Sequence, residues 1–288
     1  MPVRIVQSKQ NARLKELRRS LACPGRDDSG LVGIECPNLV EEALNAGLRV
    51  PCVFAAQGSE HLIEPLPMPP DTEILLMPQE LLTSALATQT PQPVAALVEQ
   101  PDWTWAHILG AREGAIPLIA VLAAVQDPGN LGTILRSAEA FGADGVIALP
   151  GTVSAWNPKA VRASAGSVFR LPLVAASVAD CFTNLREAGV HILTTTVRAA
   201  RPADLVDLTV PIALIFGNEG NGVPATVAEL ADEAVTIPCP GAVESLNAAV
   251  AASVMLYEAA RQRREQEFKL LGPRGGKLPG GAATGGRR

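Results

Sequence analysis

The sequence is poor in the side chains that bind metals and in those that build disulfide frameworks. Its five cysteines are far apart and include no C-x-x-C pair, and its three histidines are equally scattered. This usage predicts reduced thiols and no metal site. No apolar run approaches the roughly 18 residues of a membrane-spanning helix, and no apolar segment follows the basic N-terminus. We therefore expect no signal peptide and a cytoplasmic protein.

The composition indicates a well-packed globular protein. Of the 288 residues, 48% are hydrophobic and only 18% are charged. A chain of this length has enough apolar material for two domains with separate cores.

The charge is unevenly distributed along the chain. Residues 1–26 carry seven Lys and Arg against Glu16 alone, and residues 261–288 carry eight against two Glu, so each end has a net charge of +6. The total of −5 therefore hides an acidic body. Basic ends on an acidic body fit contacts with phosphate, although solvated helix faces and a disordered tail explain them equally well.

The first hundred residues predict a compact α/β domain, residues 1–100. The segments with a regular pattern are helices over 11–21 and 37–47 and strands over 30–35, 51–56 and 73–78. The next stretch, residues 101–114, shows no sustained period. We therefore place a linker at residues 101–116.

From residue 117 the pattern changes to apolar strands that alternate with helices. The expected strands are residues 116–126, 145–150, 169–174, 191–197, 211–217 and 233–238, and the expected helices include 131–142, 178–189 and 245–271. Such a pattern is typical of a parallel sheet covered on both faces. We expect an α/β fold with a second domain at residues 117–271, followed by a disordered, basic, Gly-rich tail at residues 272–288.

Three loops at the ends of expected strands contain polar residues that can carry chemistry, since parallel α/β sheets bind ligands there. The first loop, QDPGNLGTILR, has a turn at Pro128-Gly129, Asn130 as the expected cap of the next helix, and Arg136 within that helix. A single helical arginine is more often a solvated charge, so this loop is weak evidence by itself.

The other two loops lie further along the chain. IFGNEGNGVP has glycines that let a ligand approach the backbone, but it lacks the patterns of phosphate-binding and dinucleotide-binding loops, and a tight turn explains it equally well. TIPCPGAVESLN leads into the long last helix, for which Ser245 is the expected N-cap. The three loops suggest no hydrolytic triad or carboxylate pair. They suit holding a cofactor and orienting a hydroxyl better than hydrolysis.

Taken in order, the three loops resemble the three sequence motifs of the SpoU/TrmH family, within the SPOUT class of RNA methyltransferases. The resemblance covers residues 117–266, and NPKAVRASAGSVFRLPLV is similar to the family's usual segment between its first two motifs. Residues 8–44 and 88–97 resemble more loosely the L30e-like substrate-binding domain that precedes many members. There Cys36 and Pro93 stand where the family commonly has Gly.

The resemblance implies a fold that composition does not reveal. Family members have a deep trefoil knot in the C-terminal parallel sheet, an exception to the rule against knotted chains, and they form homodimers through the knotted region. The methyl donor that the resemblance implies is S-adenosyl-L-methionine. The residues expected to contact it are Thr195, Thr196, Gly217, Ile237 and Leu246.

The resemblance also implies a reaction, the transfer of a methyl group from a sulfonium to a ribose 2′-hydroxyl of RNA. It makes Arg136 the catalytic arginine, in a polar site completed by Asn130, Glu219, Ser245 and Asn247. An alcohol is a poor nucleophile, so the site must align it and help to remove its proton. Family proposals give that task to the arginine, but a guanidinium normally stays protonated. A charged Arg136 suits binding phosphate and stabilising the developing alkoxide.

We expect ribosomal RNA as the substrate, with transfer RNA as the alternative, because an L30e-like domain favours structured RNA. The side chains expected to bind the RNA backbone are those of the first helix, Arg13, Lys15, Arg18 and Arg19. Three other interpretations remain open: an RNA-binding or ribosome-assembly protein without catalysis, a nucleotide-dependent dehydrogenase, and an enzyme of the same fold that methylates a base.

Overall fold

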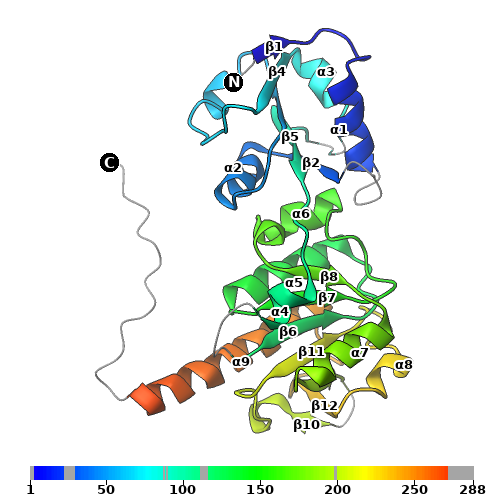
Figure 1. The fold of residues 1–288 in the computed structure, drawn as a ribbon. Helices are drawn as coiled ribbons and strands as arrows, with labels where there is room; N and C mark the ends of the chain where they lie inside the picture. Colours follow the sequence, from blue (N-terminus) through cyan, green and yellow to red (C-terminus); the bar gives the residue numbers. More distant parts are fainter. Residues whose placement is uncertain are drawn as a thin grey trace.

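The computed structural model describes residues 3–22, 30–86, 88, 90–110, 116–197 and 200–271. They form two β-sheets, one from the N-terminal hundred residues and one from the rest, and helices pack on each (Figure 1). The predicted α/β class with a C-terminal parallel sheet is confirmed. The predicted tail, residues 272–288, lies outside the described residues. No helix in the described part of the chain is long and apolar enough to cross a membrane.

The N-terminal sheet has five strands in the order β1-β4-β3-β5-β2. The strands are β1 Val3–Ile5, β2 Leu31–Glu35, β3 Cys52–Ala56, β4 Glu73–Met77 and β5 Val94–Glu99. β1, β4 and β3 are parallel, whereas β5 runs antiparallel to both of its neighbours. The sequence patterns did not predict β1, which is very short, or β5, whose two alanines are poor strand formers.

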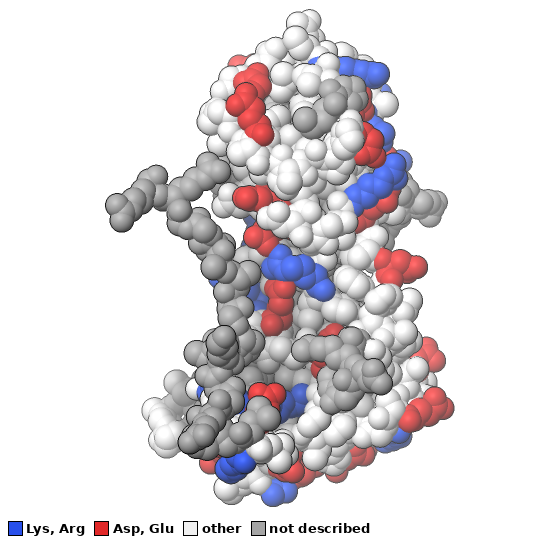
Figure 2. Space-filling model, turned by 60° about the vertical axis from the view of Figure 1, so that its left-hand side comes forward, with Lys and Arg blue, Asp and Glu red and all other residues white. Residues whose placement is uncertain are grey.

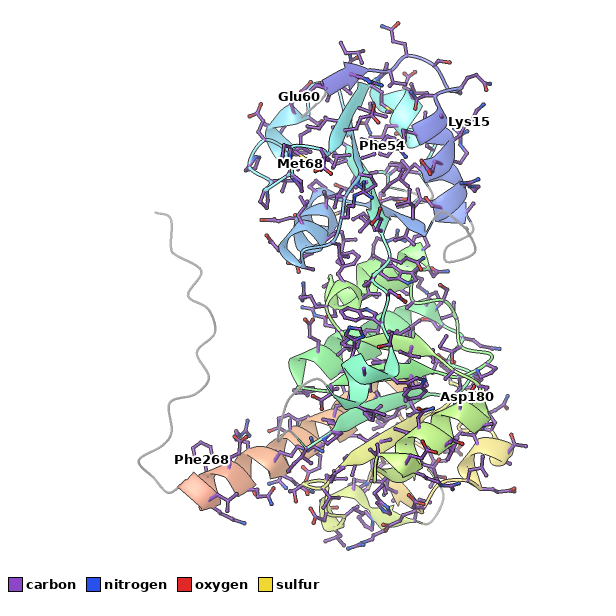
Figure 3. The ribbon with its side chains drawn as sticks, in the orientation of Figure 1. Lys15, Phe54, Glu60, Met68, Asp180 and Phe268 are labelled. Atoms are coloured by element: carbon purple, nitrogen blue, oxygen red, sulfur yellow. The ribbon has the colours of Figure 1, made fainter. Side chains whose placement is uncertain are left out.

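Helices cover both faces of this sheet. They are α1 Ala12–Ala22, α2 Pro37–Asn45, the 3-10 turn η1 Glu60–Leu62 and α3 Gln79–Thr83. α1 buries its leucines against the face that contains Phe54, and its Lys15 points to solvent (Figure 3). α2 packs Leu39 and Val40 into a different core, on the other face.

The C-terminal sheet has seven strands in the order β10-β12-β9-β11-β6-β7-β8, and every pair is parallel. The strands are β6 Leu118–Leu122, β7 Gly145–Ala148, β8 Leu173–Ala175, β9 His191–Thr195, β10 Arg201–Pro202, β11 Ile212–Phe216 and β12 Glu233–Thr236. Successive residues of β6 enter two different cores: Ala120 belongs to one, and Ile119 and Val121 belong to the other. This alternation is that of a sheet buried on both faces.

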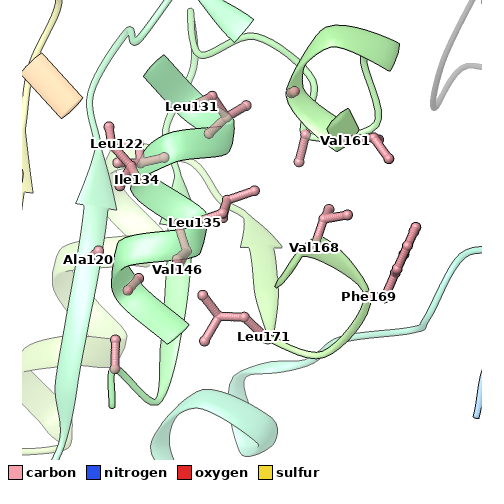
Figure 4. Close-up of a cluster of buried hydrophobic side chains, with 14 of the residues drawn as sticks. Ala120, Leu122, Leu131, Ile134, Leu135, Val146, Val161, Val168, Phe169 and Leu171 are labelled. Carbon is pink, nitrogen blue, oxygen red and sulfur yellow. The ribbon is translucent and has the colours of Figure 1, made fainter. Parts of the chain in front are cut away.

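Two groups of helices supply the cores on either side of this sheet. The elements are α4 Trp105–Leu109, α5 Pro128–Ala140, α6 Pro158–Ser164, η2 Ser167–Phe169, α7 Val178–Glu187, η3 Ala203–Leu205, α8 Ala225–Ala228 and α9 Ala248–Leu271. α5, α6 and α9 share one core, and α4, α7 and α8 share the other. Figure 4 shows α5 between β6 and the α6–η2 segment. α5 and α6 touch closely at Gly132, where a Cβ atom would lie 2.4 Å from the carbonyl oxygen of Ala160.

The junction between the two sheets contains more structure than the sequence indicated. The predicted linker includes α4, whose Ile108 is buried against Gly145. A Cβ atom on Gly145 would lie 2.7 Å from Cγ1 of Ile108. Arg170 forms ion pairs with Glu42 on α2 and with Glu139 on α5, so it joins the two parts of the chain. Figure 2 shows basic and acidic side chains intermixed around the middle of the molecule.

Candidate active site

The three polar loops emerge at one edge of the C-terminal sheet. β6 and β11 are neighbours, and only β9 separates β11 from β12. Parallel strands all end at the same edge of a sheet. The loops 123–127, 217–224 and 237–247 therefore lie on the same side, although they are far apart in the sequence.

The strand before the first loop ends four residues earlier than the predicted strand, residues 116–126. β6 ends at Leu122, and Ala124 adopts a φ of 59°. The side-chain amide of Asn218 holds this turn by donating to the carbonyl of Ala124 at 3.1 Å. The prediction that Asn130 caps the following helix is wrong. The cap is Asp127, whose Oδ1 accepts from the backbone N–H of Asn130 at 2.8 Å. The side chain of Asn130 is thus available for contacts outside the helix.

A series of hydrogen bonds through Asn130 links the three loops. Nδ2 of Asn247 donates to Oδ1 of Asn130 at 3.1 Å, and Nδ2 of Asn130 donates to Oε1 of Glu219 at 2.8 Å. The backbone N–H of Asp127 lies 3.4 Å from the same carboxylate oxygen. Asn247 and Asn130 are 117 positions apart in the sequence, and Asn130 and Glu219 are 89 positions apart. We call Asn130, Glu219 and Asn247 the polar cluster.

The prediction that Ser245 caps the last helix is also wrong. α9 begins at Ala248, and Oδ1 of Asn247 accepts from the backbone N–H groups of Ala249 and Val250 at 2.9 and 3.2 Å. These two bonds fix which end of the Asn247 amide is the oxygen, so its Nδ2 must face Asn130. Ser245 is exposed, and none of the described residues forms a hydrogen bond with its hydroxyl.

Lys159 is a charged residue next to the cluster that the sequence did not single out. Its Nζ lies 2.9 Å from Oδ2 of Asp127. The hydrogen bonds from Lys159 and from the backbone of Asn130 lower the pKa of Asp127. Lys159 stands in the second residue position of α6, whose cap is Asn157. Its partner depends on the packing of α6 against α5, for which the sequence has no signal.

Arg136 lies on α5, six residues beyond Asn130, and its side chain is exposed. Within the described ranges, no residue forms a hydrogen bond or ion pair with its guanidinium. A guanidinium without an internal partner is suited to bidentate contact with a phosphate.

The loop after β11 is closed at its base. The backbone groups of Asn218 and Gly222 exchange two hydrogen bonds of 2.9 Å. Gly222 has a φ of +69°, and a Cβ on Gly217 would lie 2.1 Å from the carbonyl carbon of Gly222. Glycine is therefore required at position 217 for the loop to fold back on itself.

The residues predicted to contact the methyl donor lie along the same edge of the sheet. They are Thr195 at the end of β9, Thr196 after it, Gly217 after β11, Ile237 after β12 and Leu246 next to the cap of α9. Ile237 and Leu246 are half-buried apolar side chains near the two ends of the segment between β12 and α9. The hydroxyl of Thr195 donates to the carbonyl of Ile215 at 2.8 Å. Apolar side chains with nearby backbone groups fit the flat faces and polar edges of a nucleoside.

The basic residues predicted to bind RNA lie on α1, in the N-terminal part. Arg13 is engaged by Glu16 at 2.8 Å and Glu73 at 3.6 Å, and Arg19 is exposed. Lys15 is exposed and Arg18 half-buried, and neither forms an ion pair with a described residue. No hydrogen bond or ion pair between described residues joins α1 to the polar cluster.

The described cysteines are not part of the polar cluster. Cys36, Cys52, Cys181 and Cys239 are free thiols. Burial raises the pKa of Cys52 and of Cys181 to about 12. The described residues contain no group of three or more His, Cys, Asp and Glu that could hold a metal ion.

The sequence and fold match one family of enzymes. A family model described as the SpoU rRNA Methylase family matches residues 117–257. The 23S rRNA (guanosine(2553)-2'-O)-methyltransferase RlmP of Bacillus subtilis is 31% identical over 88% of this chain and 97% of its own. The uncharacterized tRNA/rRNA methyltransferase slr1673 of Synechocystis is 34% identical over 90% of this chain and 94% of its own.

A solved structure extends the similarity to both parts of the chain. The SpoU methyltransferase AviRb of Streptomyces viridochromogenes, determined in complex with the cofactor AdoMet, superposes with a TM-score of 0.77. It is 30% identical to this chain, and the match covers 88% of this chain and 99% of AviRb.

Proposed function

The chain belongs to the SpoU rRNA methylase family, and from that premise we propose that it transfers a methyl group from S-adenosylmethionine to a ribose 2′-hydroxyl of RNA. The observation that carries this proposal is that Asn130, in the first turn of α5, contacts Glu219 and Asn247 from two other segments at the edge of the parallel sheet where ligands bind. A protein that only binds RNA has little need of such a cluster.

The donor would be held at this edge by Thr195, Thr196, Gly217, Ile237 and Leu246. When bound, it supplies a methyl group activated by a sulfonium. Asn130, Glu219 and Asn247 would form one wall of the site beside it, and Ser245 contributes a hydroxyl from the segment before α9. Arg136 would bind a phosphate of the target nucleotide, which orients the ribose hydroxyl and stabilises the charge that develops on its oxygen.

Ribosomal RNA is the proposed substrate. RlmP and AviRb, which match this chain over most of its length, support an enzyme with a separate N-terminal part. That part would be an L30e-like RNA-binding domain, to which α1 contributes Lys15 and Arg18, whose side chains form no ion pair with a described residue. Transfer RNA is the alternative substrate, since slr1673 is named for both RNA classes.

Two further features of the proposal, the knot and the dimer, follow from family membership. Two others, the cytoplasmic location and the lack of a metal ion, follow from the scattered cysteines and histidines. The segments around 217–223 and 237–247 would form the deep trefoil knot, and two copies would associate through the knotted region. Exposed apolar side chains on α9, among them Val250, Val254 and Tyr257, are consistent with such a dimer. The enzyme would act in the cytoplasm, and it would need no metal ion.

The test is methyl transfer from labelled S-adenosylmethionine to separately purified ribosomal RNA and transfer RNA, followed by mass spectrometry of the product nucleosides. We expect label in 2′-O-methylnucleosides of ribosomal RNA. Label in a methylated base would contradict ribose as the target. Donor binding without transfer to any RNA, including ribosome-assembly intermediates, would instead support an RNA-binding protein without catalysis.

A further inference from the structure

The proposed reaction releases a proton, and the described residues around the cluster offer few groups that can accept it. An arginine is a poor acceptor because its guanidinium stays protonated in proteins. Asparagine side chains are amides and do not act as bases in water. Carboxylates are the remaining candidates, and each of the three loops contains one: Asp127, Glu219 and Glu244.

The hydrogen bonds of the cluster orient the carboxylate of Glu219. Two backbone N–H groups at the start of α9 fix the amide of Asn247, Asn247 fixes the amide of Asn130, and Asn130 donates to Oε1 of Glu219 at 2.8 Å. Every donor in this series points toward the carboxylate, so the carboxylate is held through Oε1. Oε2 of Glu219 has no hydrogen-bond partner among the described residues, and the side chain is exposed.

The other two carboxylates are less suitable. Both oxygens of Asp127 are engaged, Oδ1 by the backbone N–H of Asn130 and Oδ2 by Lys159. Glu244 is exposed, and no hydrogen bond between described residues connects it to the polar cluster. Besides Glu219, the charged groups on the three loops are Asp127, which pairs with Lys159 of α6, and Glu244. α5 adds Arg136 and, near its end, Glu139, which pairs with Arg170.

We infer that Glu219 is the general base of the proposed methyl transfer and accepts the ribose 2′-hydroxyl proton on Oε2. This inference rests on the proposed function. As the ribose oxygen forms its bond to the methyl carbon, the bond between that carbon and sulfur breaks, and the sulfur leaves as a neutral thioether. The O–H bond breaks at the same time, and its proton passes to Glu219, which later releases it to water. Arg136 keeps its charge throughout.

The experiment compares the wild type with Glu219→Gln, Glu219→Ala and Glu244→Gln, with Glu229→Gln as a matched control on the exposed end of α8. Single-turnover methyl transfer is measured together with the dissociation constants for S-adenosylmethionine and for RNA. We expect both Glu219 variants to lose about 10²- to 10⁴-fold in rate, as general-base catalysis predicts, and to keep both dissociation constants. Added formate should restore part of the Glu219→Ala rate in proportion to its concentration, because it supplies the missing carboxylate. Glu244→Gln and the control should retain the wild-type rate.

Three results would overturn the assignment: a wild-type rate in Glu219→Gln, a loss in Glu219→Ala that formate does not relieve, or a loss of donor binding in both Glu219 variants. A rate loss confined to Glu244→Gln would move the role to Glu244. Any of these, with wild-type transfer into 2′-O-methylnucleosides, leaves the proposed function standing. No wild-type transfer to any RNA contradicts the proposed function itself.

Discussion

Asn247 has two structural tasks. Its Oδ1 caps α9, and its Nδ2 holds Asn130 in the orientation that meets Glu219. An N-cap asparagine satisfies backbone N–H groups that the helix leaves unpaired. The start of the last helix and the geometry of the polar cluster therefore depend on the same side chain.

Replacing Asn247 should lower the free energy of unfolding, whereas replacing Ser245 should leave it nearly unchanged. We expect Asn247→Ala to lower the free energy of unfolding by about 1 kcal/mol, the typical cost of a lost cap. Ser245→Ala, two residues earlier, should change it by less than about 0.5 kcal/mol because an exposed side chain makes few contacts. Urea denaturation followed by circular dichroism measures both. Equal losses would mean that Ser245, not Asn247, caps the helix.

The cysteines should differ in reactivity. Burial raises the pKa of Cys52 and of Cys181 to about 12, so almost no thiolate is present in them at pH 8. Cys36 and Cys239 are only half-buried. Alkylation of the native protein at pH 8, followed by peptide mass spectrometry, should label Cys36 and Cys239 well before Cys52 and Cys181. Rapid labelling of Cys52 would contradict the buried position of β3.

Single residues also show where sequence reasoning was sufficient. It selected Asn130, Glu219 and Asn247, which meet in the structure, but it chose the wrong cap for both helices. Asp, Asn and Ser are nearly equivalent as caps, so a sequence with two of them within a few residues does not decide between them. The exact start of each helix decides, and tertiary contacts set it.

At the scale of elements, Arg263 joins α9 to the segments that precede two strands of the C-terminal sheet. The guanidinium of Arg263 donates to the carbonyls of Ile116, Pro117, Leu208 and Val210, over 2.5 to 3.0 Å, at the beginnings of β6 and β11. Its burial lowers the pKa of the group. This contact places the far end of α9 at the edge of the sheet opposite to the polar cluster.

Removing this guanidinium should destabilise the C-terminal part. We expect Arg263→Ala to lower the free energy of unfolding by about 2–3 kcal/mol, since it leaves four carbonyls, in two partly buried bonds and two exposed ones, without this donor. The neighbouring Arg264 is exposed, and Arg264→Ala should cost less than about 0.5 kcal/mol. Guanidinium chloride titrations of both variants give the comparison. If the Arg263→Ala and Arg264→Ala variants had the same free energy of unfolding, water would be replacing the Arg263 guanidinium as a donor without loss of stability.

Elements with strong periodicity were predicted well from the sequence. The strands and helices named after residue 117 correspond to β6, α5, β7, α7, β9, β11, β12 and α9, and the parallel sheet followed from them. The strand expected over 169–174 was placed too early, because Ser167–Phe169 is a 3-10 turn and β8 spans Leu173–Ala175. Short or weakly patterned elements were not found: β1, β10 and α4 have too few residues to show a period. They form because neighbouring strands or a core are already in place beside them.

At the scale of the whole molecule, Arg170 connects the two parts of the chain. It pairs with Glu42 on α2 and with Glu139 on α5, which lie 128 and 31 residues away in the sequence. Desolvation by itself raises the pKa of Glu139, but the hydrogen bonds from Arg170 and Ser167 lower it overall. Contacts over such separations follow from packing and have no sequence pattern, which is why the junction was predicted only as a linker.

Breaking the contact between the two parts should affect RNA binding more than donor binding. Glu42→Gln removes one exposed ion pair worth up to about 1 kcal/mol, so we expect the KM for RNA to rise about two- to fivefold and the donor dissociation constant to stay the same. Glu99→Gln is the matched control, because Glu99 forms an exposed ion pair with Arg49 inside the N-terminal part. The same rise in both variants would show a general charge effect rather than a role of the junction.

The central claim is that the loops at this edge of the C-terminal sheet form the active site of an RNA 2′-O-methyltransferase. The most direct measurement is methyl transfer into 2′-O-methylnucleosides of ribosomal RNA by the wild type, Arg136→Ala and the control Arg264→Ala, with donor binding measured in parallel. We expect Arg136→Ala to lose at least about 100-fold in rate, the usual cost of removing a group that stabilises developing charge, and to bind the donor as the wild type does. A wild-type rate in Arg136→Ala would contradict the claim.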